Sequence, residues 1–189
     1  MAVGDLCTLD QVKAYLPAMQ TVTTDDALLS GLITAISAFM ATYCSRVFQS
    51  AAYQETYSGD FTGRHRLTLR QFPVTAVSSL SISGLSIPAS PDGVQPGYVW
   101  DEYGIDLIGY LFWPGRGNIA VSYTAGYAEI PADLSQACAE LVSLDYLERL
   151  RIGHKSKGID HETVAFVTDP MTSRVRAILD RYRTVRPPL

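Results

Sequence analysis

The chain has 189 residues, of which 47% are hydrophobic and 18% are charged, and its formal net charge is −4. This composition suffices for a packed core and excludes an intrinsically disordered chain. It also lacks the overall basic charge that is typical of nucleic-acid-binding proteins.

Two helices are predicted in the first 47 residues. Thr8 and Gln11 have the spacing of a capping box, so a short helix should follow Thr8 and end before Pro17. A longer helix should begin after Thr23 or Thr24, where two aspartates favour its first turn. Its bulky side chains recur with helical spacing and predict a buried face: Leu28, Leu29, Leu32, Ile33, Ile36, Phe39, Met40, Tyr43 and Val47.

The opposite face of this second helix is small and uncharged. Residues 27–45 contain no charged side chain. Because a solvated helix face usually carries charges, we predict that this one contacts another helix or a neighbouring subunit; a plainly exposed face is the alternative. A membrane span is disfavoured because polar and small residues interrupt the apolar run. The face consists of Ser30, Thr34, Ala35, Ser37, Ala38, Ala41 and Thr42.

Residues 52–124 have the patterns of β-structure. Apolar and polar residues alternate, and turn-forming residues separate the segments at 58–63, 88–97 and 113–117. The turn at 58–63 should close a hairpin. Strands are expected at 53–57, 67–69, 77–82, 98–100, 105–107 and 119–123.

The pattern becomes helical again near Pro131, which suits a first helical turn. This helix should run to about Ile152 and stop at Gly153. A polar loop at 154–161, a short strand at 163–167 and a last helix from Asp169-Pro170 should follow. We therefore predict one α+β domain: a helical core (8–47 and 131–152) of about four helices, two of them long, with a β-rich insertion (52–124) and a C-terminal arm (153–189) that ends in a helix.

The C-terminal arm is basic. It carries five arginines against one acid from residue 174 onward. Such a segment favours docking onto another copy or onto an acidic partner, whereas the alternative is a solvated helix face followed by a tail. The arginines are Arg174, Arg176, Arg181, Arg183 and Arg186, and the acid is Asp180.

The cysteines indicate a chain made in a reducing cytoplasm. There are three, Cys7, Cys44 and Cys138, and an odd number without paired spacing argues against a disulfide framework. Cys44 and Cys138 fall among apolar residues in helical patterns, so both should be buried thiols. The N-terminus lacks the basic and apolar regions of a signal peptide.

The sequence gives no catalytic or metal-binding motif, so we expect no catalytic residue, metal or cofactor. Its three histidines, His65, His154 and His161, are not spaced as ligands, and nucleophile-elbow and phosphate-loop motifs are absent. Carboxylates could gather near Asp101 and Asp106, but no basic or histidine partner is evident in the sequence. A small hydrolytic enzyme that uses these acids remains an alternative.

A short basic cluster, Arg64-His65-Arg66, lies at a predicted hairpin. It could make non-specific contacts with a nucleic-acid backbone. The alternative is a solvated turn.

Residues 121–134 resemble the signature of the head-to-tail connector (adaptor) proteins of long-tailed bacteriophages. A strand ending in Tyr-Thr-Ala-Gly-Tyr is followed by Ile-Pro-Ala-Asp-Leu, which opens a long helix ending in Tyr-Leu-Glu-Arg. Three further segments are similar to that family: Leu9–Leu16 with the helix start at Asp25–Leu29, Leu69–Ile82, and Leu179–Arg183.

This resemblance implies a structural subunit rather than an enzyme. Family members form a ring of about twelve copies beneath the portal by cyclic symmetry, extend the DNA channel and join the head to the next tail protein. The resemblance thus implies a virion protein that is assembled in the bacterial cytoplasm, passes double-stranded DNA without reading its sequence and needs no membrane. A stopper or tail-terminator protein of the same junction, classes usually richer in β-structure, is the alternative.

Three groups of residues are the candidate contact sites. The small face of the second helix gives a subunit interface at Ser30, Thr34, Ala38 and Ala41, and the basic cluster gives a possible DNA-channel loop at Arg64, His65 and Arg66. The family's C-terminal segment docks on the portal, which implies portal docking through Arg181, Arg183, Arg186, Pro187, Pro188 and Leu189.

Overall fold

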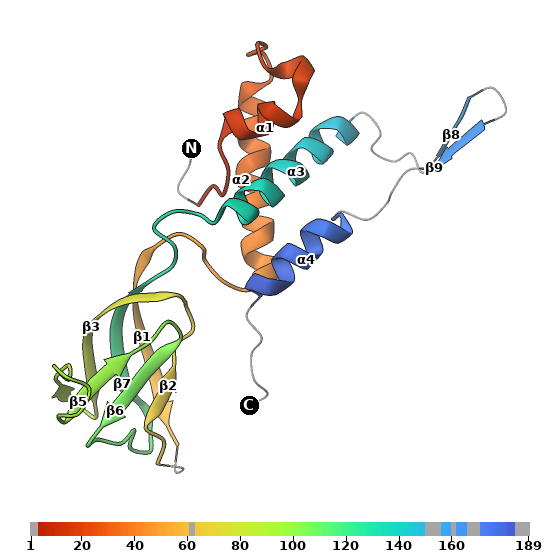
Figure 1. The fold of residues 1–189 in the computed structure, drawn as a ribbon. Coiled ribbons are helices and arrows are strands. Elements are labelled where there is room, and N and C mark those ends of the chain that lie inside the picture. The colour runs from red at the N-terminus through yellow and green to blue at the C-terminus, as the bar shows by residue number, and fades with distance from the viewer. Residues whose placement is uncertain (1–3, 61–62, 150–155, 160–161, 166–170, 184–189) are drawn as a thin grey trace. The chain divides into compact units, whose positions relative to one another are not determined.

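The computed structural model describes residues 4–60, 63–149, 156–159, 162–165 and 171–183. They belong to two compact units (Figure 1). The helical unit comprises Met1–Arg46 and Ile130–Leu189, and the β unit comprises Val47–Glu129. The described residues form four α-helices and antiparallel sheets, which confirms the predicted α+β class.

The helical unit is built from both ends of the chain. Its first helix has the predicted capping box, because Gln11 N–H donates to Thr8 Oγ1 and the Gln11 side chain accepts from Thr8 N–H. The elements are α1 (Leu9–Tyr15), the 3-10 helix η1 (Pro17–Met19), α2 (Asp26–Cys44), α3 (Ala132–Glu148), the hairpin β8 (Ser156–Ile159) and β9 (Glu162–Ala165), and α4 (Ser173–Tyr182).

Helix α2 begins later than predicted. Its N-cap is Asp25 rather than Thr23 or Thr24, and the Asp25 side chain does not cap the helix. The carboxylate instead accepts a hydrogen bond from the Tyr146 hydroxyl and lies 3.6 Å from the Arg149 guanidinium. A contact with α3 therefore replaces the local cap, and this contact has no counterpart in the local sequence.

Helix α3 is the core of the helical unit. It packs against α1, α2 and α4. Side chains on most of its circumference are buried, as expected for a central helix. They are Leu134, Ser135, Ala137, Cys138, Ala139, Leu141, Val142, Ser143 and Tyr146.

The C-terminal part departs from prediction in two places. The segment expected to be a polar loop contains strand β8, which pairs with β9. Helix α4 begins at Ser173 instead of Asp169-Pro170, because the Thr172 hydroxyl accepts from Val175 N–H and caps the helix there. The predicted stop at Gly153 and the end of the predicted strand at 166–167 lie outside the described residues.

The β unit has two sheets around one core. The first has strand order β1-β7-β3-β4 and the second has order β2-β6-β5, and all pairs are antiparallel. Buried side chains from both sheets, among them Leu80, Ile105 and Tyr123, form a single hydrophobic cluster. The strands are β1 (Ala51–Gly59), β2 (Arg66–Thr68), β3 (Val74–Ile82), β4 (Leu85–Ile87), β5 (Gly97–Trp100), β6 (Gly104–Ile108) and β7 (Gly115–Ala125).

Two details of the β prediction are wrong. Strand β1 pairs with β7 while β2 pairs with β6, so β1 and β2 lie in different sheets and do not form the predicted hairpin. The predicted turn at 113–117 is partly strand, because Gly115 lies opposite Gly59 at the irregular end of the β1–β7 ladder. A Cβ on Gly59 would lie 1.8 Å from Trp113 O, so this close approach requires glycine.

Gly126 offers a test of the end of β7. It has φ +110°, and a Cβ there would lie 2.4 Å from the Gln49 carbonyl oxygen. We expect Gly126→Ala to lower the free energy of unfolding of the β unit by about 2–4 kcal/mol, measured by urea denaturation. The control is Gly31→Ala in α2, where a Cβ meets nothing within 4 Å. It should instead stabilise the helical unit by about 0.5–1 kcal/mol, and equal effects at the two sites would contradict this account.

Candidate assembly surfaces

One side of α2 is exposed, uncharged and partly apolar. Two large side chains on it, Leu28 and Phe39, are 47% and 39% exposed. Monomeric proteins seldom expose such a continuous surface with large apolar side chains over about four turns of helix, so it has the character of a contact surface. We call these exposed residues the α2 strip: Ala27, Leu28, Ser30, Gly31, Thr34, Ala35, Ala38, Phe39 and Thr42.

The α2 strip overlaps the predicted subunit interface. Ser30, Thr34 and Ala38 are exposed, and Ala41 is half-buried. Ser37, expected on the same face, is buried because its hydroxyl accepts a hydrogen bond from Leu6 N–H at 2.9 Å. The exposed small face of α2 therefore lacks Ser37, which the sequence pattern had placed on it.

The α2 strip also includes two residues that were not predicted to be exposed. Leu28 and Phe39 were expected in the core, but the helical unit covers only a narrow side of α2. It consists of Leu29, Ile33, Ser37, Met40 and Cys44. Two residues capable of strong apolar contacts were thus missed, although the absence of charge from 27 to 45 was a usable signal.

In the described part of the chain, α2 is the one helix long and apolar enough to cross a membrane by length and composition. A core helix of a soluble protein passes the same test. Here one side of α2 is packed within the helical unit, as Figure 1 shows.

Helix α4 presents arginines outward. Its inner side buries Val175 and Leu179, and Arg174, Arg176, Arg181 and Arg183 are exposed. Within the described residues no carboxylate forms an ion pair with Arg174 or Arg181.

The only acid on α4, Asp180, accepts a hydrogen bond from the Tyr43 hydroxyl at 2.8 Å. The Arg183 guanidinium lies 5.5 Å from the centre of the Tyr43 ring. At the other end, Thr172 donates to Glu140 on α3 at 2.9 Å. Contacts of Thr172, Asp180 and Arg183 thus hold the α4 part of the predicted basic arm on the helical unit, and the remaining docking residues, Arg186–Leu189, lie outside the described part.

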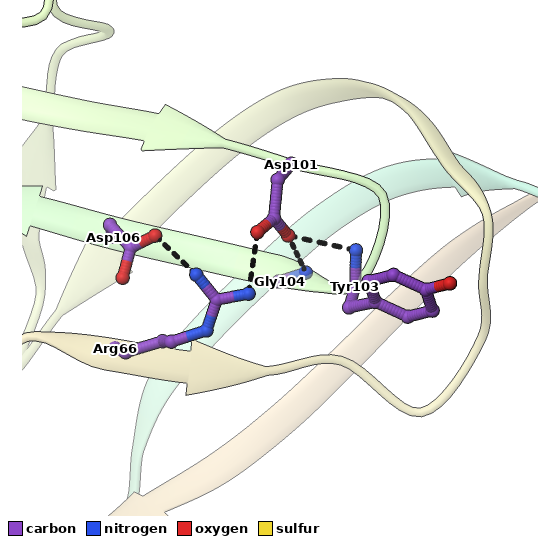
Figure 2. Close-up of polar contacts among 5 residues, drawn as sticks. All are labelled: Arg66, Asp101, Tyr103, Gly104 and Asp106. Carbon is purple, nitrogen blue, oxygen red and sulfur yellow. Dashed lines mark hydrogen bonds and ion pairs between the residues drawn. The ribbon is translucent and has the colours of Figure 1, made fainter.

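Asp101 and Asp106 share a basic partner that was not evident in the sequence. Arg66 on β2 reaches Asp101 at 2.6 Å and Asp106 at 2.5 Å (Figure 2). The second oxygen of Asp101 accepts from the backbone N–H groups of Tyr103 and Gly104 at 2.8 and 2.9 Å. Antiparallel pairing of β2 with β6 creates this cluster by placing Arg66 opposite Asp106.

The electrostatics of the cluster formed by Arg66, Asp101 and Asp106 favour a structural role over catalysis. The hydrogen bond from Arg66 lowers the pKa of Asp101, with help from the two backbone N–H groups. A general acid needs the opposite shift, towards a raised pKa. Among the described residues, no three His, Cys, Asp or Glu side chains are placed to hold a metal ion together.

The basic cluster at residues 64–66 is balanced by acids. Arg64 lies 3.3 Å from Asp60, and Arg66 is shared between two aspartates. His65 Nδ1 lies 3.1 Å from the Tyr110 carbonyl oxygen. A contact with DNA at this loop stays a prediction, and little uncompensated charge is available for it.

A comparison of sequences finds a family match over most of the chain. The sequence model described as head completion protein (HCP) matches residues 5–185. No curated protein is significantly similar to the chain in sequence.

Three solved structures share the fold. A chain in the neck of the native gene transfer agent particle, computed with C12 symmetry, has a TM-score of 0.58 at 23% identity and covers 99% of this chain and 94% of its own. The neck of the empty particle, computed with C6 symmetry, gives 0.57 at 21% identity and the same coverage. A chain in the virion of the native particle gives 0.55 at 23% identity, covering 88% of this chain and 81% of its own.

The Arg66 cluster predicts a pH dependence with a defined sign. Because the folded pKa of Asp101 is lowered, the cluster stabilises the fold above about pH 4, and this contribution is lost as pH falls through the folded pKa. Arg66→Met should raise the pKa of Asp101 towards its ordinary value, as read by carboxyl NMR titration. Since both groups are exposed, the loss of stability at neutral pH should be about 1 kcal/mol or less. Arg64→Met is the matched control and should leave Asp101 unchanged; an unaltered Asp101 titration in Arg66→Met would refute the assignment.

Proposed function

The chain belongs to the head completion protein family, whose match spans residues 5–185, and we propose that it is a ring-forming connector subunit of a phage head–tail junction. The observation that carries the proposal is the α2 strip, an uncharged surface on an otherwise charged and compact helical unit. The ring would contain about twelve copies beneath the portal, extend the DNA channel and hold the next tail protein. In this role the chain is structural and catalyses no reaction.

The α2 strip would be the contact between neighbouring subunits. Rings form by head-to-tail contacts, in which one surface of a copy meets a different surface of the next. Gly31, Ala35 and Ala38 allow close backbone approach, while Leu28 and Phe39 supply apolar area whose burial stabilises association by about 25 cal/mol per Å². The predicted interface residues Ser30, Thr34 and Ala41 lie on or beside this strip.

The basic outer side of α4 would face the portal. Arg174 and Arg181 are exposed and form no ion pair with a carboxylate of the described residues, which suits an acidic partner surface because complementary charge speeds encounter and fixes orientation. Arg181 and Arg183 lie at the end of α4, from which residues 184–189 continue the chain. The docking site would therefore combine the end of α4 with Arg186, Pro187, Pro188 and Leu189.

Passage of DNA fits the charge of the chain. A net charge of −4 gives a ring surface that does not hold phosphate, so double-stranded DNA would pass without sequence readout. A sub-micromolar affinity for duplex DNA at physiological salt would contradict this part of the proposal. A stopper or tail-terminator role at the same junction is the alternative, and the two long helices α2 and α3 favour the connector.

Negative charge on the α2 strip should block assembly without unfolding the chain. Ala35→Glu combined with Ala38→Glu should leave the free energy of unfolding within about 0.5 kcal/mol of wild type, because both positions are exposed. The same variant should occupy portal rings at least about tenfold more weakly, because each new interface would bury two carboxylates. The readout is the number of copies per portal, measured by native mass spectrometry.

The control for this variant is Ala132→Glu combined with Gln136→Glu, which adds two charges to exposed positions on α3 in the same unit. It should fill portal rings as wild type does. If the α2 variant also fills them normally, the strip is merely exposed.

Loss of the residues after Arg183 should weaken docking on the portal. A chain truncated after Arg183 should co-sediment more weakly with portal rings, whereas the full-length chain should saturate near one copy per portal subunit. Binding that survives truncation would keep the connector role and move the contact elsewhere. Absence of binding by the full-length chain would favour the stopper or terminator alternative.

A further inference from the structure

Two of the three cysteines lie in contact. Cys7 and Cys138 are 131 positions apart in the chain, yet their sulfur atoms are 3.4 Å apart, and the side chains are 1% and 0% exposed. Neither a cap nor a strand ladder requires a thiol at either position. Helix capping and strand pairing therefore do not explain the contact between these two thiols.

We propose that Cys7 and Cys138 are a site of covalent modification, at which hydrogen peroxide or a similar two-electron oxidant forms a disulfide that ties the N-terminal segment to α3. The sulfur atoms need to approach by about 1.4 Å to reach the disulfide bond length of about 2.0 Å. Both residues belong to the helical unit, so no movement between units is involved.

The surroundings of the pair set the order of the chemistry. The Cys7 thiol donates a hydrogen bond to Cys138 Sγ, and the Ser37 hydroxyl lies 3.6 Å from the same sulfur. These contacts lower the pKa of Cys138, while the pKa of Cys7 is raised because its proton is held between the two sulfurs and is shielded from water. Cys138 is therefore the thiol that reacts first.

The reaction balances with the oxidant alone. The Cys138 thiolate attacks one peroxide oxygen, the O–O bond breaks, and a sulfenic acid and water result. The Cys7 sulfur then attacks the Cys138 sulfur, the S–O bond breaks, and a second water leaves with the Cys7 proton. Two thiols lose two electrons and two protons, and one peroxide is reduced to two waters.

Access to the buried pair follows from how the N-terminal segment is attached. Residues 4–8 precede α1 and bond to α2 through Leu6 N–H to Ser37 at 2.9 Å and through Asp5 to the Thr34 hydroxyl at 3.0 Å. Opening this segment breaks these two bonds and the further interactions of Gly4 and Asp5, and local opening of one segment costs less free energy than global unfolding. Peroxide can enter during the opening, and reclosure brings the sulfurs together.

The biological setting rests on the proposed function, but the chemistry does not. A head–tail junction protein is made in a reducing cytoplasm and works in a particle outside the cell, where thiols oxidise. The disulfide would then form after release and stiffen the helical unit in the finished particle. Because the test uses the isolated full-length chain, its outcome is independent of portal binding.

The experiment treats the folded, reduced chain with low-millimolar hydrogen peroxide, then blocks the remaining thiols in denaturant and measures the intact mass. We expect the loss of two hydrogens, one blocked thiol instead of three, and a tryptic peptide that links Cys7 to Cys138. The thermal midpoint of the helical unit, followed by helical circular dichroism, should rise by about 5–15 °C because the disulfide closes a long loop.

Two variants serve as controls. Cys44→Ala should oxidise as wild type does, because the Cys44 thiol donates its hydrogen bond to the Leu179 carbonyl oxygen at 3.5 Å and not to another cysteine. Cys7→Ala should give neither the cross-link nor the rise in thermal midpoint. If Cys7→Ala fails to fold, the peptide map of the wild-type chain still decides.

Three outcomes would overturn the proposal. They are cysteines that gain oxygen atoms without a cross-link, a disulfide that involves Cys44 or a second chain, and a folded chain that stays reduced under conditions in which the denatured chain oxidises.

Discussion

Burial of α3 on most of its circumference is the constraint on which the helical unit depends. One helix that is covered by α1, α2 and α4 fixes all three, so each of them needs only one apolar side. Tyrosine–carboxylate hydrogen bonds complete the junctions between helices at the edges of this core. Between the described helices these pairs are Tyr146 with Asp25, Tyr182 with Asp133, and Tyr43 with Asp180.

This arrangement decides what is left for contacts with other molecules. Because α2 uses a narrow side against the core, its uncharged outer side stays exposed and becomes the α2 strip. Because α4 buries Val175 and Leu179 on its inner side, its arginines lie on the exposed side of the helix. The α2 strip and the basic surface of α4 thus arise from the same packing, and they suit two different neighbours in an assembly.

Local patterns in the sequence predict much of the fold, since a capping box at Thr8 and helical spacing along α2 depend on neighbouring residues alone. Contacts between distant segments account for the misses. The Asp25 side chain does not cap α2 because its carboxylate accepts a hydrogen bond from Tyr146. Arg66 lies next to Asp101 because β2 pairs with β6. The candidate surfaces were partly predictable from the absence of charge on α2, but how far the core covers that helix was not.

The most direct test of the connector account is the reactivity of a single probe on the α2 strip. Ala38→Cys places a thiol on the strip, while the natural cysteines are buried. Maleimide labelling is compared between the free chain and assembled particles, with Gln136→Cys on α3 as the reference position. The account predicts rapid labelling of Ala38→Cys in the free chain and strong protection in the particle. Equal labelling of Ala38→Cys in both would contradict an α2 contact between subunits.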